Sequence, residues 1–232
     1  GTENSALGEN ALATNTTGRE NAASGRKALF ANTTGSYNTA SGATALLANT
    51  TASYNTAHGY RALYGNTTGD HSVGMGYNAL YANTTGNLNV AIGDSALGSN
   101  VAGDRSVAIG NNALGSQNPS GNVDMYNVAV GLNAGLSVTA GTGNTLIGGL
   151  AGDAITTGSQ NTALGRSSLG ANTTASNNTA IGYNSMALNT TGTSNTAVGY
   201  SSLDANTTAH NNTAIGYDAL TTNTTGASNT AV

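Results

Sequence analysis

Residues 212–226 read Asn-Thr-Ala-Ile-Gly-Tyr-Asp-Ala-Leu-Thr-Thr-Asn-Thr-Thr-Gly, and close variants of this stretch recur along the whole chain. The opening Asn-Thr-Ala-x-Gly and its variants are spaced 17 residues apart, except for one step of 21 between Ser106 and Asn127. A fixed period of this kind is the signature of a repeat architecture. We number the positions of each repeat 1 to 17, starting from this Asn.

The spacing of the two glycines predicts the fold class. The segments between corners are three to six residues long, too short for ordinary helices, and their alternation of small polar and apolar residues is typical of strands. A 17-residue unit buries almost nothing alone, so each repeat must stack on its neighbours at a strand spacing of about 4.8 Å. We therefore expect an all-β β-solenoid over residues 1–232 as one tandem-repeat domain, a segment of a longer fibre, with a four-residue insertion forming a loop near 118–121.

The glycines differ in how strictly they recur. Position 5 is Gly in every repeat, from Gly8 to Gly216, which predicts a corner that needs positive φ or close backbone approach. Position 15 is Gly in most repeats but Ala at Ala52, Ala175 and Ala209. The second corner is therefore expected to be less demanding.

Two rows of residues are predicted to fill the interior. Position 3 is usually Ala, as at Ala40, Ala91 and Ala180. Position 9 is usually Leu, and Met186 takes the same place. In two successive repeats position 9 falls on Gly135 and Gly152, and we expect Leu136 and Leu150 to refill that space.

A second apolar row, at position 4, alternates with the interior row and must face the opposite side of its strand. Its members are Leu7, Met75, Ile92, Ile109, Val130, Ile147, Leu164, Ile181, Val198, Ile215 and Val232, with Ser24, Ser41 and His58 in the early repeats. A thin coil with apolar rows on both faces of a strand needs a partner. We expect lateral association, with a homotrimer as the preferred geometry and end-to-end assembly as a further option.

The composition agrees with stacked repeats and argues against a nucleic-acid partner and a membrane span. Charged residues make up only 7% of the chain, and like charges stacked about 4.8 Å apart would repel by about 0.9 kcal/mol even in water. Asn and Thr can instead form hydrogen-bonded ladders. Six Lys and Arg against ten Asp and Glu indicate no nucleic-acid partner, and no run approaches the roughly 20 apolar residues of a membrane span.

Candidate chemistry is sparse. Glu3 and Glu20, and Asp70 and Asp104, share repeat positions at separations resembling glycosidase carboxylate pairs, but neither pair has an evident cleft, so no catalytic residue is assigned and no enzyme is expected. His58, His71 and His210 occupy different repeat positions and lack paired ligand spacing, so no metal and no cofactor are predicted. The nine Asn-Thr-Thr sites match glycosylation acceptors, but glycans stacked at about 4.8 Å could not fit.

Two surface rows offer binding functions. A row of tyrosines at position 6 either binds sugars by ring stacking or covers the backbone corner at the preceding glycine. Its members are Tyr60, Tyr77, Tyr183, Tyr200 and Tyr217. An outward Thr row from Asn-Thr-Thr suggests ice binding, although adjacent Thr residues alternate faces and the row lapses at Val101 and Ala102. An ice-binding or carbohydrate-binding solenoid is the alternative function.

The repeats also resemble known families. The units at 212–220 and 223–226 are similar to the shaft repeats of phage tail fibres and bacterial adhesins, and Ser106 to Gly110 resembles the β-roll of trimeric autotransporter adhesin heads. The resemblance implies a parallel homotrimer located on a virion or a cell surface, outside the cell. It implies a structural shaft or adhesive stalk that projects a receptor-binding element toward a receptor or a surface glycan.

Overall fold

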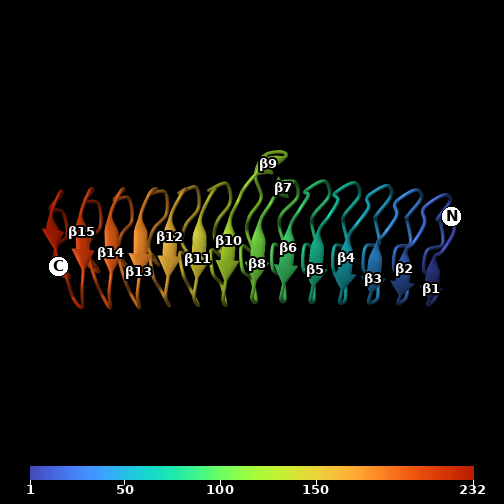
Figure 1. Ribbon diagram of the computed structural model, residues 1–232, viewed down its shortest axis with the longest axis horizontal. Helices are drawn as coiled ribbons and strands as arrows, with labels where there is room; N and C mark the ends of the chain where they lie inside the picture. The colour runs from blue at the N-terminus through green and yellow to red at the C-terminus, as the bar shows by residue number, and fades with distance from the viewer. The chain divides into compact units, whose positions relative to one another are not determined.

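The computed structural model describes residues 1–232 and contains strands and turns but no helix. It divides into two compact units, Gly1–Asp124 and Met125–Val232, each of which is a parallel β-solenoid with one turn of the chain per 17-residue repeat (Figure 1). The predicted all-β solenoid is confirmed.

In the first unit the main strands pair in parallel with residues exactly one repeat apart. Ser5 pairs with Ala22, Ala22 with Thr39, and Thr39 with Thr56. The stacked strands are β1 (Ser5–Leu7), β2 (Ala22–Ser24), β3 (Thr39–Ser41), β4 (Thr56–His58), β5 (Val73–Met75), β6 (Val90–Ile92) and β8 (Val107–Ile109).

The second unit repeats this arrangement without interruption. Val128 pairs with Thr145, and Thr145 pairs with Thr162, so the 17-residue register is kept. Its strands are β10 (Val128–Val130), β11 (Thr145–Ile147), β12 (Thr162–Leu164), β13 (Thr179–Ile181), β14 (Thr196–Val198), β15 (Thr213–Ile215) and β16 (Thr230–Ala231).

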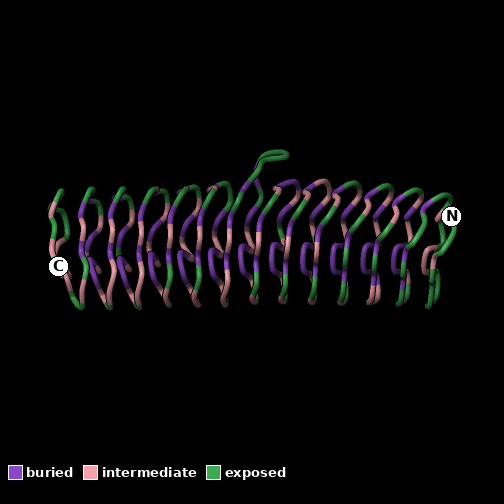
Figure 2. The backbone as a smooth tube through the Cα atoms, viewed as in Figure 1, coloured by how far each residue is buried: buried purple, intermediate pink, exposed green.

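The predicted insertion forms a loop at the end of the first unit. Two short strands, β7 (Gly103–Asp104) and β9 (Val123–Asp124), pair in parallel at its base. The loop residues 120–124 are exposed and extend away from the coils (Figures 1 and 2). Thr85 donates its hydroxyl to Asn122 Oδ1 at 2.9 Å, and Arg105 pairs with Asp124 at 2.7 Å, which holds the loop against the neighbouring coils.

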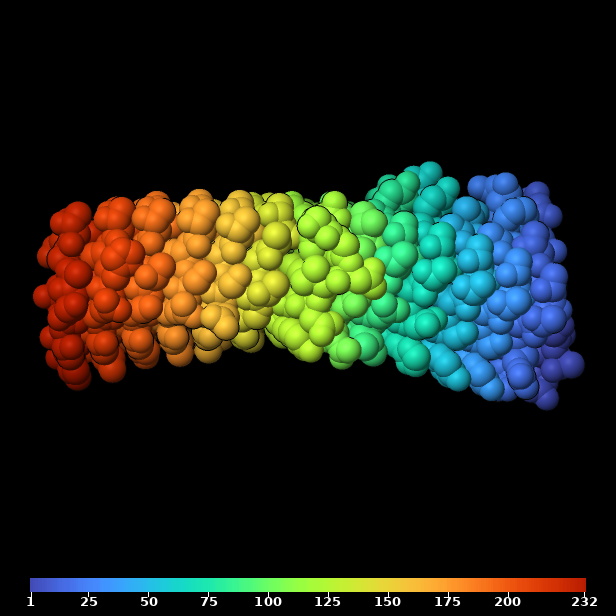
Figure 3. All heavy atoms as spheres, turned by 90° about the horizontal axis from the view of Figure 1, so that it is seen from above, coloured from blue at the N-terminus to red at the C-terminus, as the bar shows by residue number.

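Backbone hydrogen bonds join successive coils outside the strands as well. Leu29 N–H donates to the Ala45 carbonyl, Thr33 N–H to Thr50, and Lys27 N–H to the Glu9 carbonyl of the preceding coil. Because turns also bond to the coils on either side, few backbone groups need another partner. Each unit is therefore held together along its stacking direction around most of the coil, and on the face seen in Figure 3 neighbouring coils of a unit are in contact.

The interior contains the two rows that the sequence predicted. Ala40, Ala91 and Ala180 at position 3 are buried, as are Leu46, Leu97 and the other central members of position 9. The tube coloured by burial shows this buried row repeated from coil to coil within each unit (Figure 2). The core therefore combines small Ala side chains with larger Leu side chains in each coil.

The expected refilling by Leu136 and Leu150 is wrong. Both side chains are only half-buried. The space left by Gly135 and Gly152 is filled instead by Leu146, Val138 and Ile155, which are fully buried and stand where neighbouring repeats have Ala or Asn. A larger residue on the opposite wall therefore compensates for the missing Leu.

Two buried Asn rows line the rest of the interior, at positions 1 and 12. Asn38 illustrates the first row: its amide nitrogen donates to the Asn21 side chain and to the Ala52 carbonyl, while its side-chain oxygen accepts the Asn55 backbone N–H at 3.0 Å. In the second row Asn49 Nδ2 donates to Asn32 Oδ1 at 2.8 Å. The predicted Asn ladders are confirmed. The first Thr of Asn-Thr-Thr bonds differently, because its hydroxyl donates to a backbone carbonyl of the next coil, as Thr50 does to Thr67 at 3.0 Å.

Candidate functional site: exposed ladders on the coil surface

The tyrosines at position 6 form two separate stacks, one in each unit. Tyr60 and Tyr77 lie with ring centroids 5.6 Å apart in the first unit. In the second unit the separations are 5.4 Å between Tyr183 and Tyr200 and 5.2 Å between Tyr200 and Tyr217. All five side chains are exposed, but the rings are nearly parallel, so each face inside a stack is covered by its neighbour. The edges and phenol hydroxyls are what the stacks offer to solvent.

Two further aromatic stacks were not singled out from the sequence. Tyr37, Tyr54 and His71 stack at position 17 with centroids 4.9 and 4.8 Å apart, and Tyr64 stacks on Tyr81 at position 10 with centroids 5.2 Å apart. The 17-residue spacing of these rings was the signal that could have found them. A hydrogen bond to Glu20 and its negative charge raise the pKa of the Tyr37 phenol above its ordinary value.

Arginine side chains lie over three of the tyrosine stacks. The Arg61 guanidinium is 5.0 Å from the Tyr60 centroid, 5.7 Å from that of Tyr64 and 6.0 Å from that of Tyr81. Arg166 lies 5.7 Å from the Tyr183 centroid in the second unit. Cation–π contacts of this kind are worth about 0.5–1 kcal/mol at exposed sites. They fix the guanidinium groups against the tyrosine stacks.

The apolar row at position 4 faces outward, as predicted. Ile92 is 36% exposed, Leu164 45% and Ile215 41%, whereas the adjacent position 3 residues are buried. Position 2, on the same outer side, is Ser5 and Ala22 in the first two coils and Thr or Val from Thr39 onward, and it is at least partly exposed throughout. The outer face of the strands is thus a band without lysine, arginine or carboxylate side chains, in which His58 is the sole titratable group.

The Asn-Thr-Thr segments place one Thr of each pair toward solvent. The second Thr is exposed in Thr34, Thr68 and Thr191, whereas the first is half-buried in the same coils. The central Asn residues of these segments, such as Asn66, are fully buried. Their amides are engaged in the interior ladder, which leaves no room for an attached glycan.

Both carboxylates of the Asp70 and Asp104 pair act as backbone acceptors. Asp70 Oδ1 accepts the Ser53 N–H, and Asp104 Oδ1 accepts the Asn87 N–H, each at 2.6 Å. Serine and asparagine side chains do the same in neighbouring coils, as Ser36 does for Arg19. These aspartates therefore belong to a structural ladder. Partial burial raises the pKa of the Asp153 and Asp204 carboxyls.

The three histidines lie apart in the structure. His58 is exposed in the strand face, His71 stacks on Tyr54, and His210 Nδ1 accepts the Thr193 backbone N–H at 2.9 Å. No group of three His, Asp or Glu side chains is placed to hold a metal ion.

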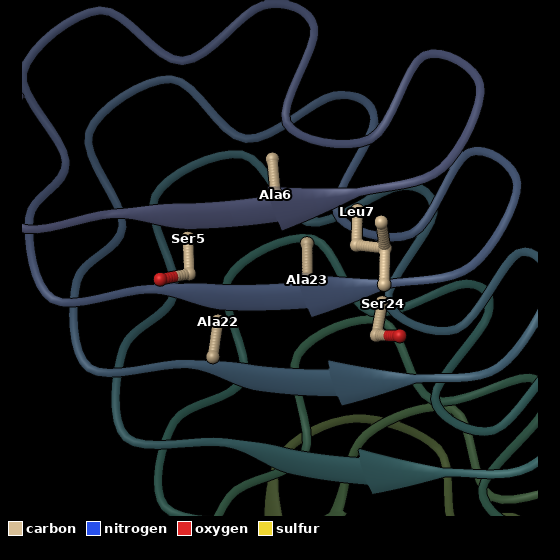
Figure 4. Close-up of a pocket in the computed structure, with 6 residues that line it drawn as sticks. All are labelled: Ser5, Ala6, Leu7, Ala22, Ala23 and Ser24. Carbon is tan, nitrogen blue, oxygen red and sulfur yellow. The ribbon is translucent and has the colours of Figure 1, made fainter.

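A shallow apolar hollow lies between β1 and β2. It is lined by Ser5, Ala6, Leu7, Ala22, Ala23 and Ser24. The two alanines of the interior row point to one side of the strands, and Ser5 and Ala22 point to the other (Figure 4). Its lining contains no titratable or nucleophilic group apart from serine hydroxyls, so it offers no catalytic chemistry.

The molecule has no helix with the length and apolar character that crossing a bilayer requires. Comparisons of the chain with protein-family models, with curated proteins and with solved structures find no match.

Proposed function

We propose that this protein is a structural shaft or adhesive stalk, of the kind found in phage tail fibres and bacterial surface adhesins, that works outside the cell or on a virion as a parallel homotrimer. The observation that carries the proposal is the exposed apolar row at position 4, which runs from Met75 to Ile109 in the first unit and through every coil of the second. Large exposed apolar bands on soluble proteins usually mark interaction surfaces. Lateral packing of identical chains would cover the row in every coil at once.

The internal construction supports a mechanical role. Buried Asn ladders and backbone hydrogen bonds run between coils, so pulling neighbouring coils apart would expose many polar groups together. The hollow between β1 and β2 contains none of the titratable groups that a catalytic centre combines. A stiff stacked element that holds another part of an assembly at a distance uses these properties directly.

Charged substitutions in the apolar row at position 4 test the proposed contact between chains. Ile181→Asp together with Ile215→Asp would place carboxylates in the shared apolar contact, where their desolvation is costly. Thr191→Asp with Thr208→Asp is the matched control, because both threonines are exposed on another face of the same unit. We expect sedimentation to show trimers for the control and dissociated chains for the isoleucine variant. Equal masses for both variants would count against the proposed interface.

Ice binding is the second candidate, because one exposed Thr per coil forms a regular row at position 14, as in Thr174, Thr191 and Thr208. Its test is thermal hysteresis of the purified protein, with and without Thr191→Tyr. Activity lost in this variant would support ice binding, and no activity in the unmodified chain would remove this candidate. Neutral sugar binding by ring stacking is less favoured, since the tyrosine faces within each stack are covered.

A further inference from the structure

One edge of the first unit gathers positive charge in a protein whose net charge is −4. We call it the basic edge and define it by side chains at positions 6, 7 and 10 of residues 21–88: Arg26, Lys27, Phe30, Tyr60, Arg61, Tyr64, Tyr77 and Tyr81. Three of the chain's six Lys and Arg residues lie in this set. No Asp or Glu occupies the same positions in these four coils; the nearest in the position 6 row are Glu9 and Asp94 on either side.

Backbone hydrogen bonds keep these residues in register. Thr44 N–H donates to the Arg26 carbonyl at 2.9 Å, Arg61 N–H to Ala43 at 3.2 Å, and Asn78 N–H to Tyr60 at 3.1 Å. Lys27 and Arg61 therefore share one row two coils apart, a backbone separation of about 10 Å from the strand spacing. The positive charges of Arg26, Lys27 and Arg61 are therefore spread along the stacking direction of the coils and are not gathered at one point.

Arg61 is held in place but keeps its charge uncompensated. Its guanidinium lies over the rings of Tyr60, Tyr64 and Tyr81, and the ion pair between Arg105 and Asp124 lies elsewhere in the unit. Lys27 is placed similarly, with Nζ 5.7 Å from the Phe30 centroid. Contacts with ring faces leave the N–H groups of both side chains free to donate to an external anion.

The tyrosine rings of the basic edge cover each other's faces, which excludes ligands that would bind by stacking between them. Tyr60 with Tyr77, and Tyr64 with Tyr81, stack on each other, so nucleobases and neutral sugars cannot stack between them. What remains is a line of cations bordered by phenol hydroxyls. We propose that the basic edge binds an extended anionic polysaccharide, its carboxylate or sulfate groups on Arg26, Lys27 and Arg61 and its hydroxyls on the tyrosine hydroxyls. This surface activity goes beyond the proposed shaft function and does not depend on it.

The test measures binding of the full 232-residue chain to three immobilised polymers: a polyuronate, dextran sulfate and neutral dextran. We expect binding to one or both anionic polymers at low salt, weakening at least tenfold at 0.5 M salt as screening increases, and none to neutral dextran. Preference between the anionic polymers distinguishes carboxylate from sulfate recognition. Arg61→Gln should weaken binding about fivefold, and Arg26→Gln, Lys27→Gln and Arg61→Gln together at least fiftyfold.

Arg166→Gln is the matched control, because Arg166 also lies over a tyrosine of the position 6 row but has no neighbouring cation there. Its affinity should equal that of the unmodified chain. The thermal transition of each variant shows that it is folded, and Arg61→Lys, which keeps the charge, should retain most of the affinity. Absence of low-salt binding, an equal loss in Arg166→Gln, or tighter binding of a single-stranded oligonucleotide would each overturn the proposal.

Discussion

Glycine at position 5 of each repeat satisfies a backbone geometry that other residues do not. Its φ lies between 128° and 142° in every coil, a region that L-residues with a side chain rarely occupy. The sequence predicted this from the recurrence of Gly alone. Position 15 has no positive φ in Gly18 or Gly35, so Ala can adopt its backbone conformation, but an added Cβ at either glycine would press on a backbone carbonyl oxygen of the next coil.

Gly165→Ala should therefore be severely destabilising. An added Cβ would meet the Gly182 backbone of the next coil, 2.6 Å from its carbonyl carbon, in addition to the strain of φ +137°. We expect a loss of about 3 kcal/mol in the free energy of unfolding. Gly170→Ala in the same coil is the control, expected within about 0.5 kcal/mol, since its nearest contact is 3.4 Å. Urea unfolding of both variants measures the difference; similar losses would refute the corner argument.

The buried Asn ladder gives a second prediction. The Asn55 side chain donates to the Gly69 carbonyl at 2.8 Å and accepts the Ser72 N–H at 2.9 Å. Asn55→Ala leaves both groups buried without a partner and should cost about 2–4 kcal/mol. Asn55→Ser should cost less, because Ser72 at the same position accepts the Asn89 N–H with its hydroxyl. Denaturant titration measures the free energy of unfolding of both variants. A larger loss for Asn55→Ser than for Asn55→Ala would show that the side-chain hydrogen bonds of this row do not stabilise the coil.

One residue-scale feature could not be foreseen. The leucines at position 9 have φ between 50° and 54°, as does Met186, and left-handed backbone costs roughly 1–2 kcal/mol for such residues. No local sequence preference indicates it. The conformation persists because it turns each Leu into the core, where burying the side chain contributes about 1.5–3 kcal/mol.

At the scale of the single coil, the exchange between Leu146 and Gly152 shows how the core keeps its volume. A Cβ on Gly152 would lie 2.8 Å from both Leu146 Cδ2 and Ile155 Cδ1. The sequence showed the missing Leu at position 9, but not which residue replaced it. Leu136 and Leu150 were nearer in sequence, yet position 3 faces position 9 across the coil, so Leu146 fills the space.

This exchange predicts coupling between the two positions. Leu146→Ala should destabilise the second unit by about 2–5 kcal/mol through the cavity that it leaves. Gly152→Leu alone should also destabilise it, through overpacking. The double variant restores the usual Ala and Leu, so its loss should fall short of the sum by about 1–3 kcal/mol. Thermal unfolding of the four proteins completes the cycle, and additive losses would show that the residues do not share one space.

At the scale of the whole molecule, the period of 17 was enough to predict an all-β solenoid, because each repeat must bury its apolar face on the next. The same periodicity identified the inward Ala and Leu rows and the outward row at position 4. The arrangement of the candidate binding residues was harder to predict. Tyr60 and Tyr77 were recognised as a ladder, but their stacking on one another and the position of Arg61 depend on side-chain packing that repeat spacing does not specify.

Oligomeric state is the property on which the shaft proposal depends most. The exposed row at position 4 has Ser24, Ser41 and His58 early in the first unit and apolar residues in every coil of the second. If this row is shared between chains, burial of Ile, Val and Leu side chains would contribute about 25 cal/mol per Å² of apolar surface removed from water. A trimer would then resist dilution.

The mass of the purified chain in solution, measured by sedimentation equilibrium across a wide range of concentrations, tests this most directly. We expect a single species of three times the 22.7 kDa chain mass that persists on dilution. A monomer at all concentrations would contradict the shaft proposal, since the apolar row would then be exposed to solvent without a copy of the chain to cover it.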